Sequence, residues 1–219
     1  MNRILSRCIP ALALVTQMHA AIAEPGIIAL AGPDQQQGAE VDACRPALLG
    51  AGGAPRWRVM RNAAAAGGAM IGDVSGEAHD VRYPACFFDA LAARDLEISV
   101  DITPMSGEMD RAGGLIVRAK DDQNYYVVRA NALEHNVRLY HVVAGVRRQF
   151  AGVERHVFSD RAQNLKLRAE GDRFTAWFDG KEVFQARDRT FSGSGGVGLW
   201  TKADSVTGFS SLVVDVLAR

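Results

Sequence analysis

The sequence predicts an all-β domain of the sandwich or barrel kind, and three observations carry this prediction. Apolar and polar residues alternate strictly in short runs, such as "DLEISVDI" at 95–102. Turn residues separate these runs, among them Asp121-Asp122, Ala144-Gly145 and Gly171-Asp172. No segment after residue 56 shows a long 3.6-residue periodicity, although Ala90–Arg94 could form one helical turn.

The strands can be placed in order along the chain. In the first clear run Leu96, Ile98 and Val100 face the core. Further runs follow at 113–120, 124–131, 136–143, 164–171 and 195–201. In "FTAWFDGKEVFQA" the pair Asp179-Gly180 predicts a tight hairpin, since both residues tolerate the positive φ angles of a type I′ turn.

Length and composition fit one domain behind a leader. The chain has 219 residues, 48% of them hydrophobic, with 25 basic and 25 acidic residues. No basic stripe indicates nucleic acid and no acidic block indicates a disordered tail. Charge therefore points to no nucleic-acid partner.

Residues 1–23 are predicted to be a signal peptide. Arg3 and Arg7 precede a short apolar run, and Ala21-Ile22-Ala23 fits a cleavage site before Glu24. The alternative is a membrane anchor, which the short, interrupted apolar run disfavours. We expect a periplasmic or secreted protein with no membrane contact once the signal is removed, an approach segment at 24–55 that is flexible and rich in Ala, Gly and Pro, and the sandwich at 56–219.

Two cysteines remain after removal of the signal, which contains Cys8. Cys44 and Cys86 can form a disulfide in an oxidising compartment. Two separate buried thiols are the other interpretation, and the sequence leaves both open.

One face of neighbouring strands carries unusual hydrogen-bonding chemistry. Alternation places Tyr126 and Val128 in the core, as it does Val137 and Leu139 of the next strand. The opposite face is polar and receives Tyr125, Val127, Arg129, Asn131, Asn136, Arg138 and Tyr140, with Arg118 from the preceding strand and Glu134 and His135 at the rim. Strands about 4.8 Å apart bring such side chains together.

This mixture of guanidinium, carboxamide and phenol groups suits a polyhydroxylated ligand such as a small saccharide. The alternative is a solvated sheet on which the arginines pair with Glu97 and Asp101. A second cluster, in "GGVGLWTKADS", sets Trp200, Lys202 and Asp204 at alternate positions. Trp200 could stack on a sugar or belong to the core.

The stretch from "AGGLIVRAKDDQNYYVVRANALEHNVRLYHVVAG" to "VGLWTKADS" resembles the 3-keto-disaccharide hydrolase domain family over about residues 57–217. That family is similar to concanavalin-type and laminin-G-type jelly rolls. The resemblance implies an antiparallel two-sheet jelly roll whose concave face binds or cleaves glycans, with some members linked to 3-keto-glycosides. It supplies no catalytic residues, and the E-x-D-x-x-E strand motif of other jelly-roll glycosidases is missing here.

For an enzyme, Glu134 and Asp204 are the candidates for proton transfer. No cofactor and no zinc site are expected, because the histidines lack ligand spacing. Asp101, Glu108 and Asp110 could hold a structural calcium, but a solvated acidic loop is favoured. Three functions follow in order: a glycan-active domain, a non-catalytic glycan-binding module, and a laminin-G-like module that binds another protein.

Overall fold

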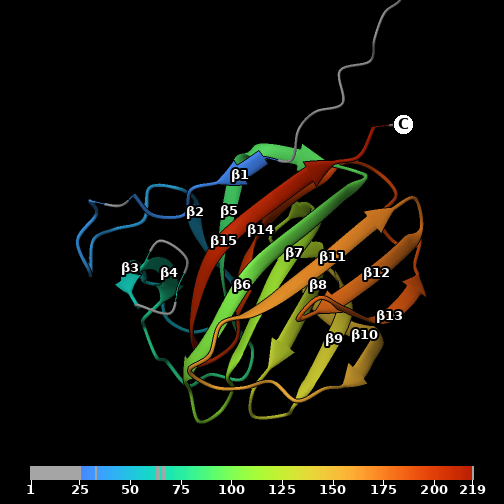
Figure 1. Cartoon of the computed structure of the whole chain (residues 1–219). Helices are drawn as coiled ribbons and strands as arrows, with labels where there is room; N and C mark the ends of the chain where they lie inside the picture. The colour runs from blue at the N-terminus through green and yellow to red at the C-terminus, as the bar shows by residue number, and fades with distance from the viewer. Residues whose placement is uncertain (1–25, 33, 63–64, 66–67, 219) are drawn as a thin grey trace, which may run out of the picture.

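The computed structural model describes residues 26–32, 34–62, 65 and 68–218. They form two antiparallel sheets that pack face to face, and the strands of one cross in front of those of the other in Figure 1. Sheet A has the order β13-β12-β11-β6-β15-β4-β3, with β1 paired to β15, and sheet B has the order β10-β9-β8-β7-β14-β5-β2. The predicted all-β sandwich is confirmed.

The strands have the following bounds. Those of sheet A are β1 (Gly26–Ile28), β3 (Trp57–Arg61), β4 (Ala69–Asp73), β6 (Leu96–Ser106), β11 (Gln163–Glu170), β12 (Arg173–Phe178), β13 (Lys181–Arg187) and β15 (Val206–Val216). Those of sheet B are β2 (Arg45–Gly50), β5 (Arg82–Ala93), β7 (Ala112–Asp121), β8 (Asn124–Asn131), β9 (Asn136–Val143), β10 (Val146–Glu154) and β14 (Gly195–Thr201).

The main core lies between the sheets and follows the alternation of the sequence. Ile98 and Val100 of β6 are fully buried in it, as are Val128 of β8 and Leu139 of β9. The predicted hairpin joins β12 to β13 with positive φ at Asp179 and Gly180. The period of two therefore fixed which face of each strand is apolar.

The segment 24–55 was expected to be a flexible approach, and the structure corrects this. Strand β1 pairs with β15 in sheet A, and β2 pairs with β5 in sheet B. Leu49 is 1% exposed, because the apolar side of β2 packs with neighbouring residues of sheet B such as Ala85 and Trp200. Residues 26–32 and 34–55 thus contribute strands to the sandwich, while the predicted signal peptide lies outside the described residues.

A disulfide joins Cys44 to Cys86, the first of the two alternatives that the sequence left open. The disulfide connects the residue before β2 to β5. Next to the disulfide, Arg45 of β2 lies opposite Phe87 of β5. The expected helical turn at Ala90–Arg94 is wrong, since β5 continues to Ala93 with an irregular register.

A second, smaller core covers the outward face of sheet B. Trp200, Tyr125 and Tyr140 belong to it and are at most 8% exposed. The guanidinium of Arg147 lies over the rings of Tyr83, Tyr140 and Trp200, with distances of 4.6–5.6 Å from Cζ to the ring centroids. The middle of this face is therefore filled by side chains.

Within the part of the chain that the structure covers, we find no helix of the length and apolarity needed to cross a membrane.

Candidate functional site

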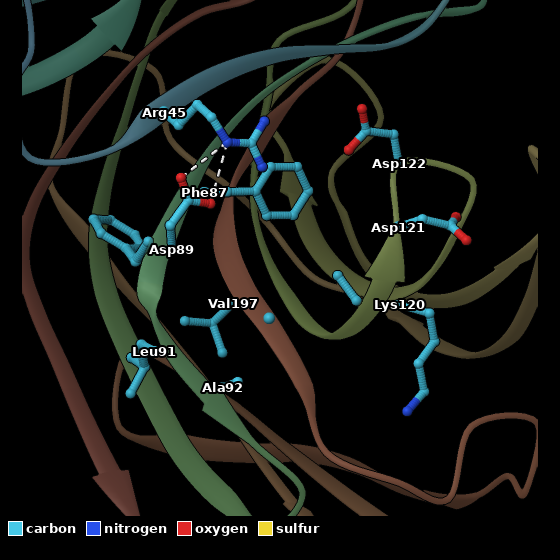
Figure 2. Close-up of a pocket in the computed structure, with 12 residues that line it drawn as sticks. Arg45, Phe87, Asp89, Leu91, Ala92, Lys120, Asp121, Asp122 and Val197 are labelled. Atoms are coloured by element: carbon cyan, nitrogen blue, oxygen red, sulfur yellow. Dashed lines mark hydrogen bonds and ion pairs between the residues drawn. The ribbon is translucent and has the colours of Figure 1, made fainter.

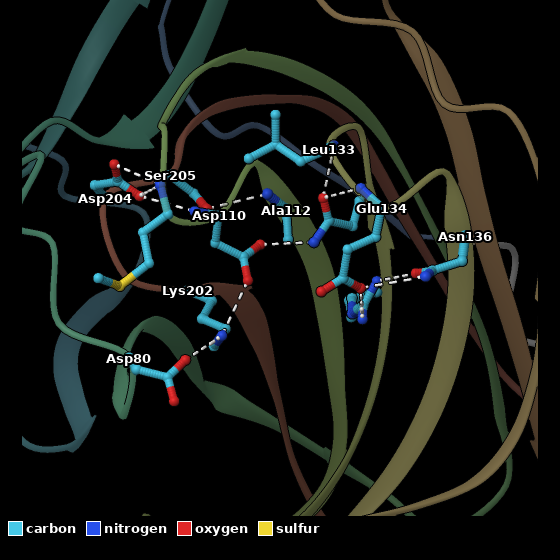
Figure 3. A network of polar contacts seen from close by, with 12 residues as sticks. Asp80, Asp110, Ala112, Leu133, Glu134, Asn136, Lys202, Asp204 and Ser205 are labelled. Atoms are coloured by element: carbon cyan, nitrogen blue, oxygen red, sulfur yellow. Dashed lines mark hydrogen bonds and ion pairs between the residues drawn. The ribbon is translucent and has the colours of Figure 1, made fainter.

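Several connections meet at one end of sheet B and carry a cluster of polar side chains. The end of β8 and the starts of β7 and β9 are adjacent there, because Asn131 pairs with both Ala112 and Asn136. The turn after β14 joins them, since Thr201 lies opposite Gly113. We call seven connected polar side chains at this end the rim cluster: Asp80, Asp110, Arg129, Asn131, Glu134, Asn136 and Lys202. Figure 3 shows this network of polar contacts.

Arg129 organises one half of the rim cluster. Its Nη2 donates to Glu134 Oε2 at 2.7 Å and to the Tyr140 hydroxyl at 3.1 Å, and its Nη1 donates to Asn136 Oδ1. Asn136 Nδ2 donates to the same Glu134 oxygen at 3.2 Å. The Arg129 side chain is 6% exposed whereas that of Glu134 is 48% exposed, so the buried donor fixes a carboxylate that solvent or a ligand can reach.

Lys202 organises the other half. Its Nζ donates to Asp80 Oδ1 at 2.7 Å and lies 3.1 Å from Asp110 Oδ2, so it bridges two carboxylates (Figure 3). Asn131 Nδ2 donates to Asp110 Oδ1 at 2.8 Å, and Asn131 Oδ1 accepts from the backbone N–H groups of residues 133 and 134. Asn131 therefore connects the Lys202 half to the Glu134 half.

Burial and neighbouring charges shift the pKa values of the rim cluster in different directions. Partial burial raises the pKa of Glu134, but the Arg129 guanidinium and the Asn136 amide outweigh it and hold that pKa below its usual value. Burial raises the pKa of Asp110, against the attraction of Lys202. Burial lowers the pKa of Lys202, but hydrogen bonding to Asp80 and the charge of Asp110 raise it overall. Lys202 is thus a cation at neutral pH.

A buried arginine holds the turn that carries Lys202. Arg82 Nη1 donates to Ala203 O and to Asp73 Oδ2, and the Ala203 N–H donates back to Arg82 O. The side chains of Arg82 and Asp73 are both 0% exposed. This buried ion pair holds the backbone beside the rim cluster in place, because loss of either partner would leave an unpaired buried charge and lower the free energy of unfolding.

Asp204 takes a structural role in place of the expected proton transfer. Its carboxylate accepts hydrogen bonds of 2.7–3.1 Å from the backbone N–H groups of Glu108, Met109 and Asp110. Desolvation raises the pKa of Asp204, but these three donors outweigh it and lower the pKa overall. Asp204 thus fixes the loop that presents Asp110.

Arg118 was expected on the polar face and lies elsewhere. A register shift in β7 gives it a φ of 52° and turns it toward the sheet A side, where its guanidinium lies 5.3 Å from the Phe174 ring. There it donates to the carbonyls of Arg94 and Phe191. Strict alternation fails at this residue because a bulge adds one residue to the strand.

Three other predicted residues also fall outside the rim cluster. Trp200 is fully buried and Tyr125 is 1% exposed, so both are second-core residues and the stacking role expected for Trp200 is corrected. Arg138 is next to Arg129 in register but pairs with Glu154 of β10. The predicted residues that the structure does bring together are Arg129, Asn131, Glu134, Asn136, Tyr140 and Lys202.

The alternative pairing partners and the calcium set are not assembled. Glu97 bonds Lys166 and Asp101 bonds Asn164, all on sheet A, so neither carboxylate meets the arginines of sheet B. Asp110 instead bonds Lys202 and Asn131 in the rim cluster. Among the described residues no group of three or more His, Cys, Asp or Glu side chains is placed to hold a metal ion.

Sequence reasoning missed Asp80 as a site residue and considered Asp110 only for calcium. Both residues lie in connections between strands. Residues there do not alternate between two faces, so the sequence pattern does not predict where their side chains point. Asp110 lies two residues before the start of β7, and Asn131 at the end of β8 was already predicted at the site. The position of Asp110 near the start of a strand that neighbours Asn131 could therefore have indicated that Asp110 belongs to the site.

Comparison with known proteins finds solved structures that share this β-sandwich fold. No family model matches the chain. The levanase of Bacillus subtilis (strain 168) is 32% identical over 108 residues, which are 48% of this chain and 16% of the levanase. The chain therefore matches only a small part of that relative.

Solved structures show the fold alone, because the sequence identities are low. A carbohydrate-binding module, CBM66 of Bacillus subtilis, superposes with a TM-score of 0.60 at 21% identity, covering 80% of this chain and 97% of the module. The exoplasmic domain of VIP36, in a form bound to Ca²⁺ and mannose, gives a TM-score of 0.54 at 11% identity and covers 80% and 84%. A galectin-like protein of unknown function from Bacillus subtilis gives 0.53 at 11% identity and covers 74% and 90%.

Proposed function

We propose that the protein binds a saccharide at the rim cluster and does not cleave it. The observation that carries this proposal is the fixed alternation of charge from Asp80 through Lys202 to Asp110, next to the pair of Arg129 and Glu134. Sugar hydroxyls both donate and accept hydrogen bonds, so they match a surface that offers carboxylate oxygens beside cationic N–H groups. A ligand that carried one sign of charge would meet repulsion from half of the cluster.

The comparisons support a saccharide as the ligand class. The superposed module from Bacillus subtilis is a carbohydrate-binding module by name, and the VIP36 domain was solved with mannose. The sequence relative is a levanase, and this chain matches a part of it that is 16% of its length. A part of that size is in keeping with a module rather than a whole enzyme.

The state of the carboxylates favours binding over hydrolysis. A glycosidase needs a carboxylic acid that stays protonated near neutral pH and a second carboxylate facing it. The pKa of Glu134 is lowered, and Asp204 is occupied by three backbone donors. Neither candidate for proton transfer therefore supplies a protonated acid for cleavage of 3-keto-glycosides, which the family resemblance implied. Asp110, whose pKa burial raises, is 3% exposed and is held by Lys202 and Asn131.

The proposed location is the periplasm or the exterior of the cell. The predicted signal at residues 1–23 and the Cys44–Cys86 disulfide both fit an oxidising compartment. N-terminal sequencing of the protein exported from a bacterial host tests this, and we expect the mature chain to begin at Glu24. An unprocessed chain recovered from the cytoplasm would contradict it.

The binding proposal is tested by isothermal titration with mannose, glucose, lactose, 3-keto-lactose and levan oligosaccharides. We expect Glu134→Gln to raise the Kd of the bound sugar by about 10-fold or more, as for loss of a hydrogen bond to a charged group. The matched control is Glu170→Gln, since Glu170 also pairs with an arginine, Arg168, but on sheet A. Equal affinity of both variants and the wild type would refute the site.

The same preparations distinguish binding from cleavage. We expect no product from 3-keto-lactose or levan oligosaccharides after prolonged incubation. Product release by the wild type that is lost in Glu134→Gln would show that the rim cluster is an active site.

A further inference from the structure

The far end of sheet B from the rim cluster contains a hollow of about 240 Å³ (Figure 2). Here β5 and β7 end and β14 begins, whereas the rim cluster lies where β7 begins and β14 ends. Phe87 and Ala119 line the hollow and pack with the second core, so the hollow opens on the same face of the sheet as the rim cluster. We call it the β14 hollow.

Two bulges at one level of the sheet create this space. On one side of Val197, residues 88–91 of β5 are unpaired between the register pairs Phe87–Gly198 and Ala92–Gly196. On the other side β7 also shifts register, at the bulge that turns Arg118 inward. Bulges at both neighbours of one strand interrupt the ladder, and bulges are over-represented beside binding and active sites.

The base of the β14 hollow is made of small residues. Ala92, Ala119 and Gly196 line it, and a Cβ built on Gly196 would meet nothing closer than Ala119 at 3.8 Å. Leu91 and Val197 add an apolar wall. The hollow therefore exists because these strand residues have small side chains or none, and it is not a gap between loops.

Charged groups surround this apolar base. Figure 2 shows Arg45 and Asp89 on one side, and Lys120, Asp121 and Asp122 on the other. Arg45 Nε donates to both oxygens of Asp89 at 2.9–3.1 Å, and among the described residues no hydrogen bond is found for either Nη group. The Asp122 carboxylate likewise has no hydrogen bond within that part of the chain.

Arg45 is oriented by its neighbours, although its side chain is 52% exposed. Its guanidinium lies 5.4 Å from the centroid of the Phe87 ring, and the Cys44–Cys86 disulfide joins the residues that precede both. A second hollow of about 490 Å³ continues from the first and shares Arg45, Asp121 and Asp122. Pre-organised donors lower the entropic cost of binding.

We propose that the β14 hollow is a second saccharide site, so that the domain is bivalent. This rests on the proposed function for the class of ligand. The hollow is lined by two basic and three acidic residues, which disfavours an anionic ligand. Lys120 bonds Ser194 O, and Asp121 bonds Gln123 and Asn124. The Arg45 Nη groups and the Asp122 carboxylate, by contrast, have no hydrogen bond among the described residues and lie beside an apolar base. Neutral polyhydroxylated molecules use that combination.

The two sites are separate stretches of one face. Ala112 and Ala119 of β7 mark the two ends, and seven residues of strand span about 23 Å. The second core fills the middle under Arg147, so one short sugar cannot reach both sites. A polysaccharide can, and two linked contacts raise its apparent affinity on the order of 100-fold over either contact alone.

The test is a titration of ¹⁵N-labelled protein with levan oligosaccharides and, separately, with mannose, followed by amide chemical shifts. We expect shifts around residues 133–136 from the rim cluster and around residues 119, 196 and 197 from the β14 hollow. Gly196→Leu fills the hollow without backbone strain and should abolish only the second set. Glu134→Gln should abolish only the first set.

Binding to polymeric levan gives an independent measure. We expect each single variant to lose on the order of 100-fold in apparent affinity, with Arg45→Met matching Gly196→Leu. Arg168→Met is the control, since Arg168 also forms an exposed ion pair but on sheet A. It should bind as the wild type does.

The outcomes separate the two proposals. Shifts confined to the rim cluster overturn the second site and leave the proposed function standing. Shifts at the β14 hollow alone, lost in Gly196→Leu, uphold the hollow as a site and overturn the rim cluster. Shifts at neither end with either probe overturn both.

Discussion

At the scale of single residues, Asp204 and Glu134 show how surroundings give one functional group different roles. Both carboxylates were candidates for proton transfer, and both have a lowered pKa. Asp204 receives three backbone donors from one loop, whereas Glu134 receives side-chain donors and stays half exposed. The first therefore holds the loop in shape and the second is available to a ligand.

Replacement of Asp204 by Ala should cost roughly 2 kcal/mol of unfolding free energy at neutral pH, because hydrogen bonds to a charged acceptor are lost. Asp204 has a lowered pKa in the folded state, so its contribution is complete above its unfolded pKa of about 3.9 and disappears as pH falls through the folded value. Urea unfolding at pH 7 and pH 2.5 measures this difference.

The control for this variant is Asp42→Ala, which removes an exposed carboxylate away from the loop. It should change the unfolding free energy by less than about 0.5 kcal/mol. A cost for Asp204→Ala that is the same at both pH values would show that the charge of Asp204 is not what stabilises the loop.

At the scale of elements, alternation predicted the regular strands and failed at the bulges. Tyr126, Val128 and Leu139 face the core as their period requires. Arg118 does not follow its strand, because β7 has one extra residue relative to β14, and this reverses the face from that point. No local sequence signal marks the extra residue, since its position depends on pairing with β14.

Pairing between distant segments was equally hidden in the sequence. The segment 24–55 has little periodicity of its own, yet β1 and β2 are held by β15 and β5. For the candidate site, strand residues such as Arg129 and Asn136 could be predicted from their face. Asp80 could not, because its place beside Lys202 depends on a connection between the two sheets.

The disulfide makes a measurable contribution at this scale. It closes a separation of 42 residues, and its removal in the double variant Cys44→Ala, Cys86→Ala should lower the unfolding free energy by roughly 3–4 kcal/mol on the chain-entropy account. The measurement is denaturant unfolding of the variant and the oxidised wild type. If the variant and the wild type unfold with equal denaturant midpoints and slopes, the disulfide adds no stability, and pairing with β5 is sufficient to hold β2 in sheet B.

The same double variant tests the link between the disulfide and the β14 hollow. Because Cys44 and Cys86 are adjacent to Arg45 and Phe87, their loss should weaken the second set of amide shifts more than the first. Equal weakening at both ends would mean that the disulfide affects only global stability.

At the scale of the whole molecule, the outward face of sheet B has a filled middle and two polar ends. The second core explains why Trp200 and Tyr125 are inaccessible although their strand positions point to the predicted face. Charged groups therefore lie at the two ends of the face, in the loops of the rim cluster and beside the bulges of the β14 hollow, and our proposal places ligand binding there. This arrangement suits attachment to a saccharide chain at separate points.

The most direct test of the central claim is a crystal structure of the protein with a levan oligosaccharide. We predict sugar hydroxyls within hydrogen-bond distance of the Glu134 carboxylate and of Lys202 Nζ, with Arg129 still paired to Glu134. A sugar bound only to the surface of sheet A, with the rim cluster untouched, would contradict the account.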